Sequence, residues 1–320
     1  MGGLIVALKR KREIFTIVNL LAGGGKARQR WRRFTENVSD RDFDPDIHFT
    51  EYRGHAGQLA RQAVASGYKR LVVFGGDGTL NEALNGVIEQ DELIDSDIEL
   101  VYLGAGSSCD VEKLFPGRLP LPERVLSEKC YRSEVVKVNC FDPTGAPVTR
   151  YFLANSSIGV ISESIVAFNR KRSFMSFLKR LNVDVAVLAA GFRTVLGFGN
   201  FAAEITIDQK EQIVRVLKNV TIFKCAYFGG GMNYGVPSAF NDGKLHVAII
   251  GGMSWLRTLS YIPSLYSGTV LKKGKAEYHQ GQRVTITGEE LNVAVEADGE
   301  IIGRPPCEYF ILPQKIRLVL

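Results

Sequence analysis

The sequence lacks the features that would place it in a disulfide-rich, zinc-binding or membrane-spanning class. Its four histidines do not pair at metal-ligand spacing, so a zinc site is not expected. No apolar run approaches the ~20 residues needed to span a bilayer, and the longest uncharged apolar stretch is residues 185–192. The five cysteines are scattered without CxxC spacing, which favours reduced cytosolic thiols over disulfides: Cys109, Cys130, Cys140, Cys225 and Cys307.

The first residues carry no recognisable targeting pattern. The sequence starts MGGLIVALKRKRE, and about six apolar residues precede the charges, so a signal peptide is not expected. Val6 stands where a myristoylation signal needs serine or threonine. These absences predict a cytoplasmic location.

Acidic residues are fewer than basic ones, 34 against 40, which gives a net charge of +6 and a pI near 9.0. This balance favours a polyanionic partner, which could be nucleic acid, a nucleotide or an anionic membrane. No nucleic-acid-binding motif or interleaving of aromatic and basic residues accompanies the charge. We therefore expect no nucleic-acid partner.

The first third of the sequence alternates strand-like and helix-like runs. Strands are predicted at 13–19, 46–52, 71–74 and 98–103, and helices at about 26–38, at 55–66 and after Thr79. Such alternation predicts an α/β domain with a mostly parallel sheet that is covered on both faces.

From about Glu134 the runs are mostly extended and separated by turn signals, which predicts a second domain, an antiparallel β-sandwich. We place the boundary at 133/134, and the last ~10 residues are candidates for a return to the first domain. The predicted strands are 134–141, 149–155, 202–207, 213–224, 245–250, 283–287, 292–296 and 308–319.

One amphipathic helix is predicted within the second domain, from about Lys171 to Leu196, with basic residues such as Lys179 and Arg180 beside its apolar stripe. A helix packed on its own domain explains this pattern. The alternative is a basic amphipathic surface that touches anionic lipid, together with the run at 9–12.

The strongest motif is Gly75-Gly76-Asp77-Gly78-Thr79, which follows a buried strand and opens a helix. Glycines there let the backbone approach a phosphate, and the helix N-terminus favours an anion. A carboxylate among phosphates requires a cation, so Asp77 indicates Mg²⁺. The alternative is a plain strand-to-helix turn, in which Thr79 and Glu82 form a capping box.

Two further glycine-rich turns follow predicted strands, at 19–26 and at 104–110. The first is not a Walker A loop, because the GxxxxGK[ST] spacing is absent, and it could be only a flexible loop. Three turns after three strands of one parallel sheet should line a single edge, and this convergence is stronger evidence than any one turn.

The predicted β domain contains two acidic turns, Asn241-Asp242-Gly243 and Asp298-Gly299-Glu300, and a glycine run at 229–231. Asn-Asp-Gly and Asp-Gly are ordinary hairpin turns, so from the pattern alone we predict hairpins at both places.

In this order, and over nearly the whole chain, the motifs resemble the diacylglycerol kinase catalytic family, which includes sphingosine, ceramide and bacterial lipid kinases. GGDGT is its hallmark, although NAD kinases carry the shorter GGDG. Residues 19–23 resemble the family's N-P-x-S-G loop, and 104–113 resemble its G-T-G-S-G-N-D-F-A-R segment. The GGGM…P-x-A…DG-x-L stretch and the late DGE separate lipid kinases from NAD kinases.

The resemblance implies an N-terminal α/β nucleotide domain, a C-terminal β-sandwich, and ATP and Mg²⁺ as cofactors. By resemblance Glu300 is the general base with Asp298 beside it, and Asp77 helps to organise Mg·ATP. Asp242 resembles a ligand of a structural Mg²⁺, with Ala239 and Lys244 supplying backbone carbonyls. The nucleotide-binding residues expected from the motifs are Asn19, Leu20, Leu21, Ala22, Gly23, Thr50, Gly75, Gly76, Asp77, Gly78, Thr79, Glu82, Gly104, Ala105 and Asp110.

The sequence departs from the family pattern at three positions. Leu20 replaces a proline, Ala105 replaces a threonine that usually meets ATP, and Cys109 replaces the asparagine of an Asn-Asp pair. We expect an ATP- and Mg²⁺-dependent lipid kinase that docks transiently on a membrane, with diacylglycerol the first acceptor to consider. Ceramide, sphingosine and phosphatidylglycerol stay open as acceptors. An NAD kinase, a non-catalytic lipid- or nucleotide-binding regulator and a homodimer are further alternatives.

Overall fold

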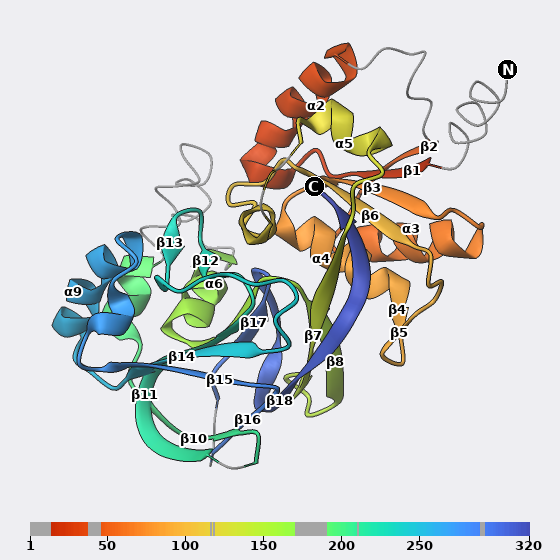
Figure 1. Cartoon of the computed structure of the whole chain (residues 1–320). Helices are drawn as coiled ribbons and strands as arrows, with labels where there is room; N and C mark the ends of the chain where they lie inside the picture. Colours follow the sequence, from red (N-terminus) through yellow and green to blue (C-terminus); the bar gives the residue numbers. More distant parts are fainter. Residues whose placement is uncertain are drawn as a thin grey trace, which may run out of the picture. The chain divides into compact units, whose positions relative to one another are not determined.

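The structure is a computed structural model that describes residues 14–37, 46–115, 117, 119–169, 191–209, 211–288 and 292–320. The chain divides into two compact units (Figure 1). Unit 2 runs from Val136 to Leu312, and unit 1 comprises the preceding residues together with Pro313–Leu320. Two strands, β7 (Tyr131–Phe141) and β18 (Glu300–Val319), have residues in both units.

Unit 1 is built on a parallel sheet, with the strand order β2-β1-β3-β6-β18. Only the last residues of β18 take part, with Arg317 opposite Glu99 and Val319 opposite Val101. The central strands β3 and β6 contain uninterrupted apolar runs, Leu71–Phe74 and Leu100–Leu103, with both faces buried, as expected when helices cover a parallel sheet. The other strands are β1 (Ile14–Val18), β2 (Asp46–Phe49), β3 (Arg70–Gly75) and β6 (Glu99–Gly104).

Helices lie on both faces of this sheet (Figure 1). On one face α3 (His55–Ala65) packs against α4 (Asp77–Val87), and on the other α2 (Lys26–Asn37) lies near α5 (Leu121–Leu126). The α3–α4 contact depends on Gly57 and Gly86, because a Cβ on Gly86 would stand 2.2 Å from the Gly57 carbonyl oxygen. Short 3-10 helices occur at Ala22–Gly25 (η1) and Val111–Leu114 (η2), and β4 (Ile88–Glu89) pairs with β5 (Glu92–Leu93).

Unit 2 consists mainly of antiparallel strands that share one apolar core. The strand order is β15-β14-β11-β10-β16-β18, and β9 pairs with both β11 and β17. The core contains residues of the strands in this order, such as Ile205 and Ile222, and residues of the strands that pair beside it, such as Val138 of β7 and Ile158 of β9. The strands that complete it are β8 (Pro147–Phe152), β9 (Asn155–Gly159), β10 (Phe201–Ile207), β11 (Glu211–Phe223), β14 (Leu245–Gly251), β15 (Ala276–Gly281), β16 (Arg283–Thr287) and β17 (Val295–Ala297).

A smaller apolar cluster lies beneath α9 (Trp255–Tyr266) and includes Phe223, Tyr234 and Tyr261. The segment between β11 and β14 carries the short hairpin β12 (Tyr227–Phe228) with β13 (Met232–Asn233). The remaining elements are α6 (Val160–Asn169) and η3 (Val270–Lys272).

The predicted fold class, an α/β domain with a parallel sheet followed by an antiparallel β-sandwich, is confirmed. The predicted helix 171–196 lies mostly outside the described residues, as does the basic run 9–12. Of that helix, residues 191–196 are described and are helical. Across the described residues, no helix is both long enough and apolar enough to cross a bilayer.

The hairpin prediction holds at one of the two acidic turns. Asp298-Gly299 joins β17 to β18, with Ala297 opposite Glu300. Asn241-Asp242-Gly243 does not form a hairpin, because the strand that follows it, β14, pairs with β11 and β15 rather than with a strand just before the turn. That prediction was wrong, because a turn signature does not show which strands pair.

Candidate functional site

Three glycine-rich turns meet at one edge of the unit 1 sheet. They follow β1, β3 and β6, which are parallel neighbours, so their carboxyl ends share an edge. Gly106 lies so close to Gly76 that a Cβ on Gly106 would stand 2.6 Å from the Gly76 Cα. Gly23 has φ +60°, and a Cβ there would stand 3.0 Å from the Ala105 carbonyl oxygen. The predicted convergence of the turns is confirmed.

The Asn19 side chain connects the first turn to the second. Its Nδ2 donates to Thr79 Oγ1 at 3.0 Å, and its Oδ1 accepts from the Leu21 N–H at 3.0 Å. Leu20 and Ala22 pack against the unit 1 core, whereas the Leu21 side chain is exposed. The Thr50 N–H donates to the Val18 carbonyl oxygen at 2.9 Å, which places Thr50 at the same edge.

Asp77 connects the second turn to the third. Its Oδ2 accepts from the Asp110 N–H at 2.9 Å, and its Oδ1 accepts from the Val111 N–H and the Tyr102 hydroxyl, both at 3.2 Å. These backbone donors begin η2, where an acidic side chain is stabilising. In this structure Asp77 therefore fixes the shape of the turn, whatever it does for a ligand.

The amino terminus of α4 lies at the centre of this edge. Gly76 is its N-cap, with no side-chain hydrogen bond to the cap, and Gly78 and Thr79 lie in the first turn. The predicted capping box of Thr79 and Glu82 is wrong, because Glu82 turns to another helix. Its Oε1 accepts from the Gly54 N–H at 2.8 Å and its Oε2 from the Ala56 N–H at 3.2 Å, so Glu82 caps α3.

The third turn is held from beneath by buried groups. Gly104 lies opposite Gly75 across β3 and β6, and the Ala105 N–H donates to the Gly75 carbonyl oxygen at 2.6 Å. The Ala105 side chain is fully buried in the apolar core. Asp110 pairs with Lys113, at 2.6 Å between Oδ1 and Nζ.

Cys109 has φ +47°, a left-handed conformation in which asparagine is favoured over most residues. Burial, followed by the charges of Asp77 and Glu112, raises the pKa of the Cys109 thiol to about 11. The thiol is therefore protonated near neutral pH, and it is a poor nucleophile in this site.

Sequence reasoning missed the buried ion pair of Glu112 and Arg124 below the third turn. The two side chains are 2.6 Å apart and nearly inaccessible to solvent. Glu112 also accepts from the Gly104 N–H at 3.2 Å, and Arg124 donates to the Tyr102 carbonyl oxygen at 3.0 Å. No sequence spacing relates these residues, so only the fold could find them.

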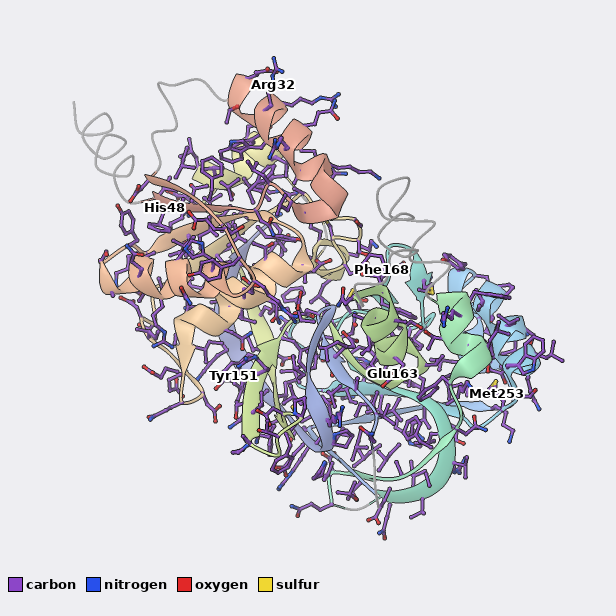
Figure 2. The ribbon with its side chains drawn as sticks, turned by 180° about the vertical axis from the view of Figure 1, so that it is seen from behind. Arg32, His48, Tyr151, Glu163, Phe168 and Met253 are labelled. Atoms are coloured by element: carbon purple, nitrogen blue, oxygen red, sulfur yellow. The ribbon has the colours of Figure 1, made fainter. Side chains whose placement is uncertain are left out.

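One basic residue of α2 contacts this edge. Arg30 donates to the Gly106 carbonyl oxygen at 3.2 Å. Arg32, in the middle of the same helix, points into solvent (Figure 2) and pairs with Glu36. The Arg30 contact adds positive charge where the turns meet.

In unit 2, Asp298 and Gly299 form the two-residue turn between β17 and β18. Their φ values of 47° and 86° are those of a type I′ hairpin, for which Asp-Gly is a favoured sequence. The Asp298 carboxylate is buried and accepts from the N–H groups of Leu153 (3.0 Å), Ala154 (2.9 Å) and Asn155 (3.2 Å). Asp298 thus anchors the turn to the loop between β8 and β9.

Glu300 is the first residue of β18 and is half-buried. Ala297 lies opposite Glu300 across the turn, and the residue before it, Glu296, is a fully buried carboxyl group whose Oε2 accepts from the Gly299 N–H at 2.9 Å. Burial raises the pKa of Glu296 to about 8, and the charge of Asp298 adds to this. The sequence pattern did not indicate Glu296, because alternation along a strand does not distinguish a buried acid from an exposed one.

The loop around Asp242 holds a buried lysine. Lys224 Nζ contacts the Asp242 carboxylate and donates to the Lys244 carbonyl oxygen at 2.7 Å. The Ala239 N–H donates to the Lys224 carbonyl oxygen at 3.2 Å. The structure therefore brings the three expected metal ligands into one loop, but it places an ammonium group among them. No cluster of three His, Cys, Asp or Glu side chains suited to a metal occurs within the described ranges.

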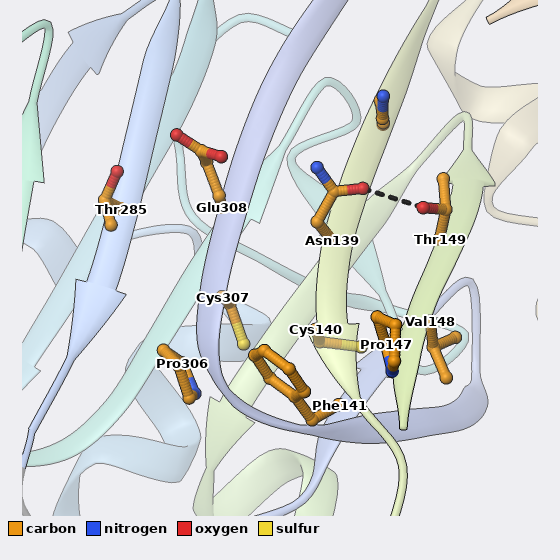
Figure 3. Close-up of a pocket in the computed structure, with 11 residues that line it drawn as sticks. Asn139, Cys140, Phe141, Pro147, Val148, Thr149, Thr285, Pro306, Cys307 and Glu308 are labelled. Atoms are coloured by element: carbon orange, nitrogen blue, oxygen red, sulfur yellow. Dashed lines mark hydrogen bonds between the residues drawn. The ribbon is translucent and has the colours of Figure 1, made fainter. Parts of the chain in front are cut away.

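A cavity of about 590 Å³ lies elsewhere in unit 2, between strands β7 and β8 on one side and β16 and β18 on the other (Figure 3). Phe141, Pro147, Val148 and Pro306 make one part apolar, and Asn139, Thr149 and Glu308 make another polar. None of the residues expected to bind nucleotide, act in catalysis or hold metal lines this cavity.

Comparison with known proteins gives two family matches. Residues 13–139 match the diacylglycerol kinase catalytic domain, and residues 168–320 match the YegS C-terminal NAD kinase beta sandwich-like domain. The chain is 24% identical over 314 residues to the "Putative lipid kinase YtlR" of Bacillus subtilis, covering 95% of this chain and 98% of that protein. It is 25% identical over 279 residues to a "Diacylglycerol kinase" of Staphylococcus carnosus, covering 86% and 84%.

Solved structures share the fold. A crystal structure of a "putative diacylglycerol kinase" from Bacillus anthracis superposes with a TM-score of 0.71 at 22% identity, covering 96% of this chain and 94% of that one. A second diacylglycerol kinase structure from the same organism has a TM-score of 0.64 at 18% identity and covers 96% of both chains.

Proposed function

The chain belongs to the diacylglycerol kinase catalytic family and is a lipid kinase, and we propose that it transfers the γ-phosphoryl group of ATP to a hydroxyl group of a membrane lipid. Diacylglycerol, which would give phosphatidic acid, is the first acceptor to test. The observation that carries the proposal is the meeting of three glycine-rich turns around Asp77 at one sheet edge, in a chain of this family.

The nucleotide phosphates would bind where these turns meet. Three features favour an anion at this edge. The glycines have no Cβ atoms, so their backbone can come close to a phosphate, and the amino terminus of α4 has no side-chain cap from Gly76. Arg30, which contacts Gly106, adds positive charge. The hydrogen bonds of Asn19 and Asp77 fix the turns against one another, so little rearrangement is needed when the nucleotide binds. Thr50 and Glu82, at the same edge, would complete the surroundings of ATP.

A magnesium ion would be held here by oxygen ligands. Asp77 supplies a carboxylate at this edge, and Mg²⁺ in phosphoryl-transfer sites binds one or two carboxylates together with substrate phosphates. When bound, the ion neutralises charge that develops on the transferred phosphoryl group. In this proposal Asp77 binds the ion and also holds the start of η2 through its hydrogen bonds, so a substitution of Asp77 would affect both.

Glu300 would be the general base. The lipid hydroxyl oxygen forms a bond to the γ-phosphorus, the bond to the bridging oxygen of ADP breaks, and the hydroxyl proton passes to the Glu300 carboxylate. A general base must be held in a fixed position relative to the hydroxyl group. The type I′ turn holds Glu300 in this way, because three backbone N–H groups fix Asp298 two residues before it. Asp298 is therefore a positioning residue in this proposal.

We also propose that the enzyme docks on a membrane surface through the helical segment 191–197. Phe192 and Leu196 are one helical turn apart and are 52% and 47% exposed, with Arg193 exposed between them. Exposed apolar side chains beside a cation match the interface of an anionic bilayer. The lipid acceptor would thus be taken from the membrane during a transient, peripheral contact.

The test uses labelled ATP with Mg²⁺ and mixed micelles that contain diacylglycerol, ceramide, sphingosine or phosphatidylglycerol. Wild type is compared with Glu300→Gln and with Glu204→Gln, which makes the same charge change at a half-buried position of β10. We expect one labelled lipid, a fall in kcat of about 10²–10⁴ in Glu300→Gln, and no change in Glu204→Gln. Labelling of no lipid, or equal activity in Glu300→Gln, contradicts the proposal.

A further inference from the structure

The side chain of Lys224 is wholly buried, which is rare for a lysine unless the ammonium group is paired. It follows β11 directly, and its backbone lies beside the loop between β8 and β9, where the Lys224 N–H donates to the Ala154 carbonyl oxygen at 2.8 Å. Its Nζ contacts the Asp242 carboxylate and donates to the Lys244 carbonyl oxygen at 2.7 Å. Hydrogen bonds therefore hold both the backbone and the ammonium group of Lys224.

The Asp242 carboxylate is satisfied by groups of the protein. Its Oδ1 also accepts from the Lys244 N–H at 3.2 Å, and its Oδ2 lies 2.8 Å from His246 Nε2. A carboxylate accepts hydrogen bonds, so His246 carries its proton on Nε2, and its Nδ1 faces the Tyr278 hydroxyl at 2.6 Å.

A divalent ion fits this loop poorly. The Asp242 carboxylate and the Lys244 carbonyl are two of the three oxygen groups expected to bind Mg²⁺, and both already contact the Lys224 ammonium. An ion on the same oxygens would lie close to a fixed positive charge with no water between them, which is strongly repulsive at low dielectric. The ligand set is present, but a cation belonging to the chain occupies it.

We propose that the Lys224 ammonium is the resident cation of this loop, in place of the structural Mg²⁺ expected at Asp242, so that unit 2 folds without a divalent metal. The backbone of the same residue lies beside the loop that holds the turn before Glu300. Ala154 accepts from the Lys224 N–H, and its own N–H donates to Asp298 Oδ1 at 2.9 Å. This inference concerns the folded state of unit 2 and holds whether or not the proposed lipid substrate is right.

The first experiment measures thermal unfolding of the nucleotide-free protein in EDTA and in MgCl₂, and Mn²⁺ binding by electron paramagnetic resonance. Wild type is expected to unfold at the same temperature in both solutions, and to bind as much Mn²⁺ as Asp242→Asn. A wild-type protein that loses stability in EDTA and regains it with Mg²⁺, also in an Asp77→Asn background, would overturn the proposal.

The second experiment removes the internal cation. Lys224→Ala leaves space and an unpaired carboxylate, so Mg²⁺ should raise its unfolding temperature by several degrees and Mn²⁺ should gain a binding site. Lys224→Met removes the charge but keeps the volume, so it should be destabilised with little rescue by metal. If Lys224→Ala folds but gains no Mn²⁺ site, the loop is not a cation site and the proposal fails. If Lys224→Ala does not fold in any solution, the unfolding of wild type in EDTA and in MgCl₂ tests the proposal instead.

Discussion

The carboxylate of Asp77 accepts a hydrogen bond of 2.9 Å from the backbone N–H of Asp110, thirty-three residues later in the chain. This bond joins the turn after β3 to the turn after β6, so a residue expected to serve a ligand also builds the site. The effects of changing it should therefore include both binding and stability.

For Asp77→Asn we expect a loss of nucleotide affinity together with a lower free energy of unfolding, by about 2 kcal/mol or more, because an amide group would face backbone N–H donors. Isothermal titration with a non-hydrolysable ATP analogue and urea unfolding measure the two effects. Asp97→Asn, an exposed position in the same unit, should change neither. Full stability in Asp77→Asn would show that the bonds to η2 matter little.

For Gly106→Ala we expect a clash, because the new Cβ would stand 2.6 Å from the Gly76 Cα and both backbones must move. The free energy of unfolding should fall by about 1–3 kcal/mol, and nucleotide affinity should fall about tenfold or more. Gly199→Ala is the matched control, because a Cβ there meets nothing within 4 Å. Unchanged nucleotide affinity in Gly106→Ala would show that the contact between Gly76 and Gly106 does not shape the nucleotide site.

Glu296 should make stability depend on pH, because burial raises its pKa from 4.5 to about 8. Between these values the unfolded chain has lost a proton that the native protein keeps. The free energy of unfolding should therefore fall as pH rises, by up to about 1.4 kcal/mol per pH unit, and level off above about pH 8. Glu296→Gln should remove this slope, so that its stability relative to wild type increases from acid to alkaline pH. Parallel slopes in urea unfolding would contradict the assignment, and Glu204→Gln is the control.

Membrane contact through 191–197 predicts that Phe192→Ser with Leu196→Ser weakens binding to anionic vesicles about tenfold or more, because two apolar side chains no longer enter the interface. Vesicle sedimentation measures it. The matched control is Val214→Ser with Val216→Ser, which removes two exposed apolar side chains from β11. Equal losses in both pairs would mean that the effect is not specific to the helix.

The sequence predicted the fold class and the meeting of the glycine turns for a clear physical reason. Buried strands such as Leu71–Phe74 are uniform apolar runs, and parallel strands bring the turns that follow them to one edge. Local patterns carry this information, because strand type and turn position depend on neighbours in the chain.

What the sequence could not predict depends on contacts between distant residues. Glu82 has the spacing of a capping box, but it reaches back to cap α3 instead. Lys224 is separated by 18 residues from the carboxylate that it pairs with, and Glu112 by 12 from Arg124. Nothing in the neighbouring residues distinguishes these buried charges from solvated ones, so their partners emerge only from the fold.

Strand β18 has residues in both units, and this has a consequence for synthesis on the ribosome. Residues 317–319 complete the sheet of unit 1 beside β6, and Leu318, Val319 and Leu320 are buried there. Until translation reaches these residues, the nascent chain presents β6 as an open edge with unpaired backbone groups. The sheet of unit 1 is thus completed only after the whole of unit 2 has been translated, and its open edge needs protection from aggregation until then.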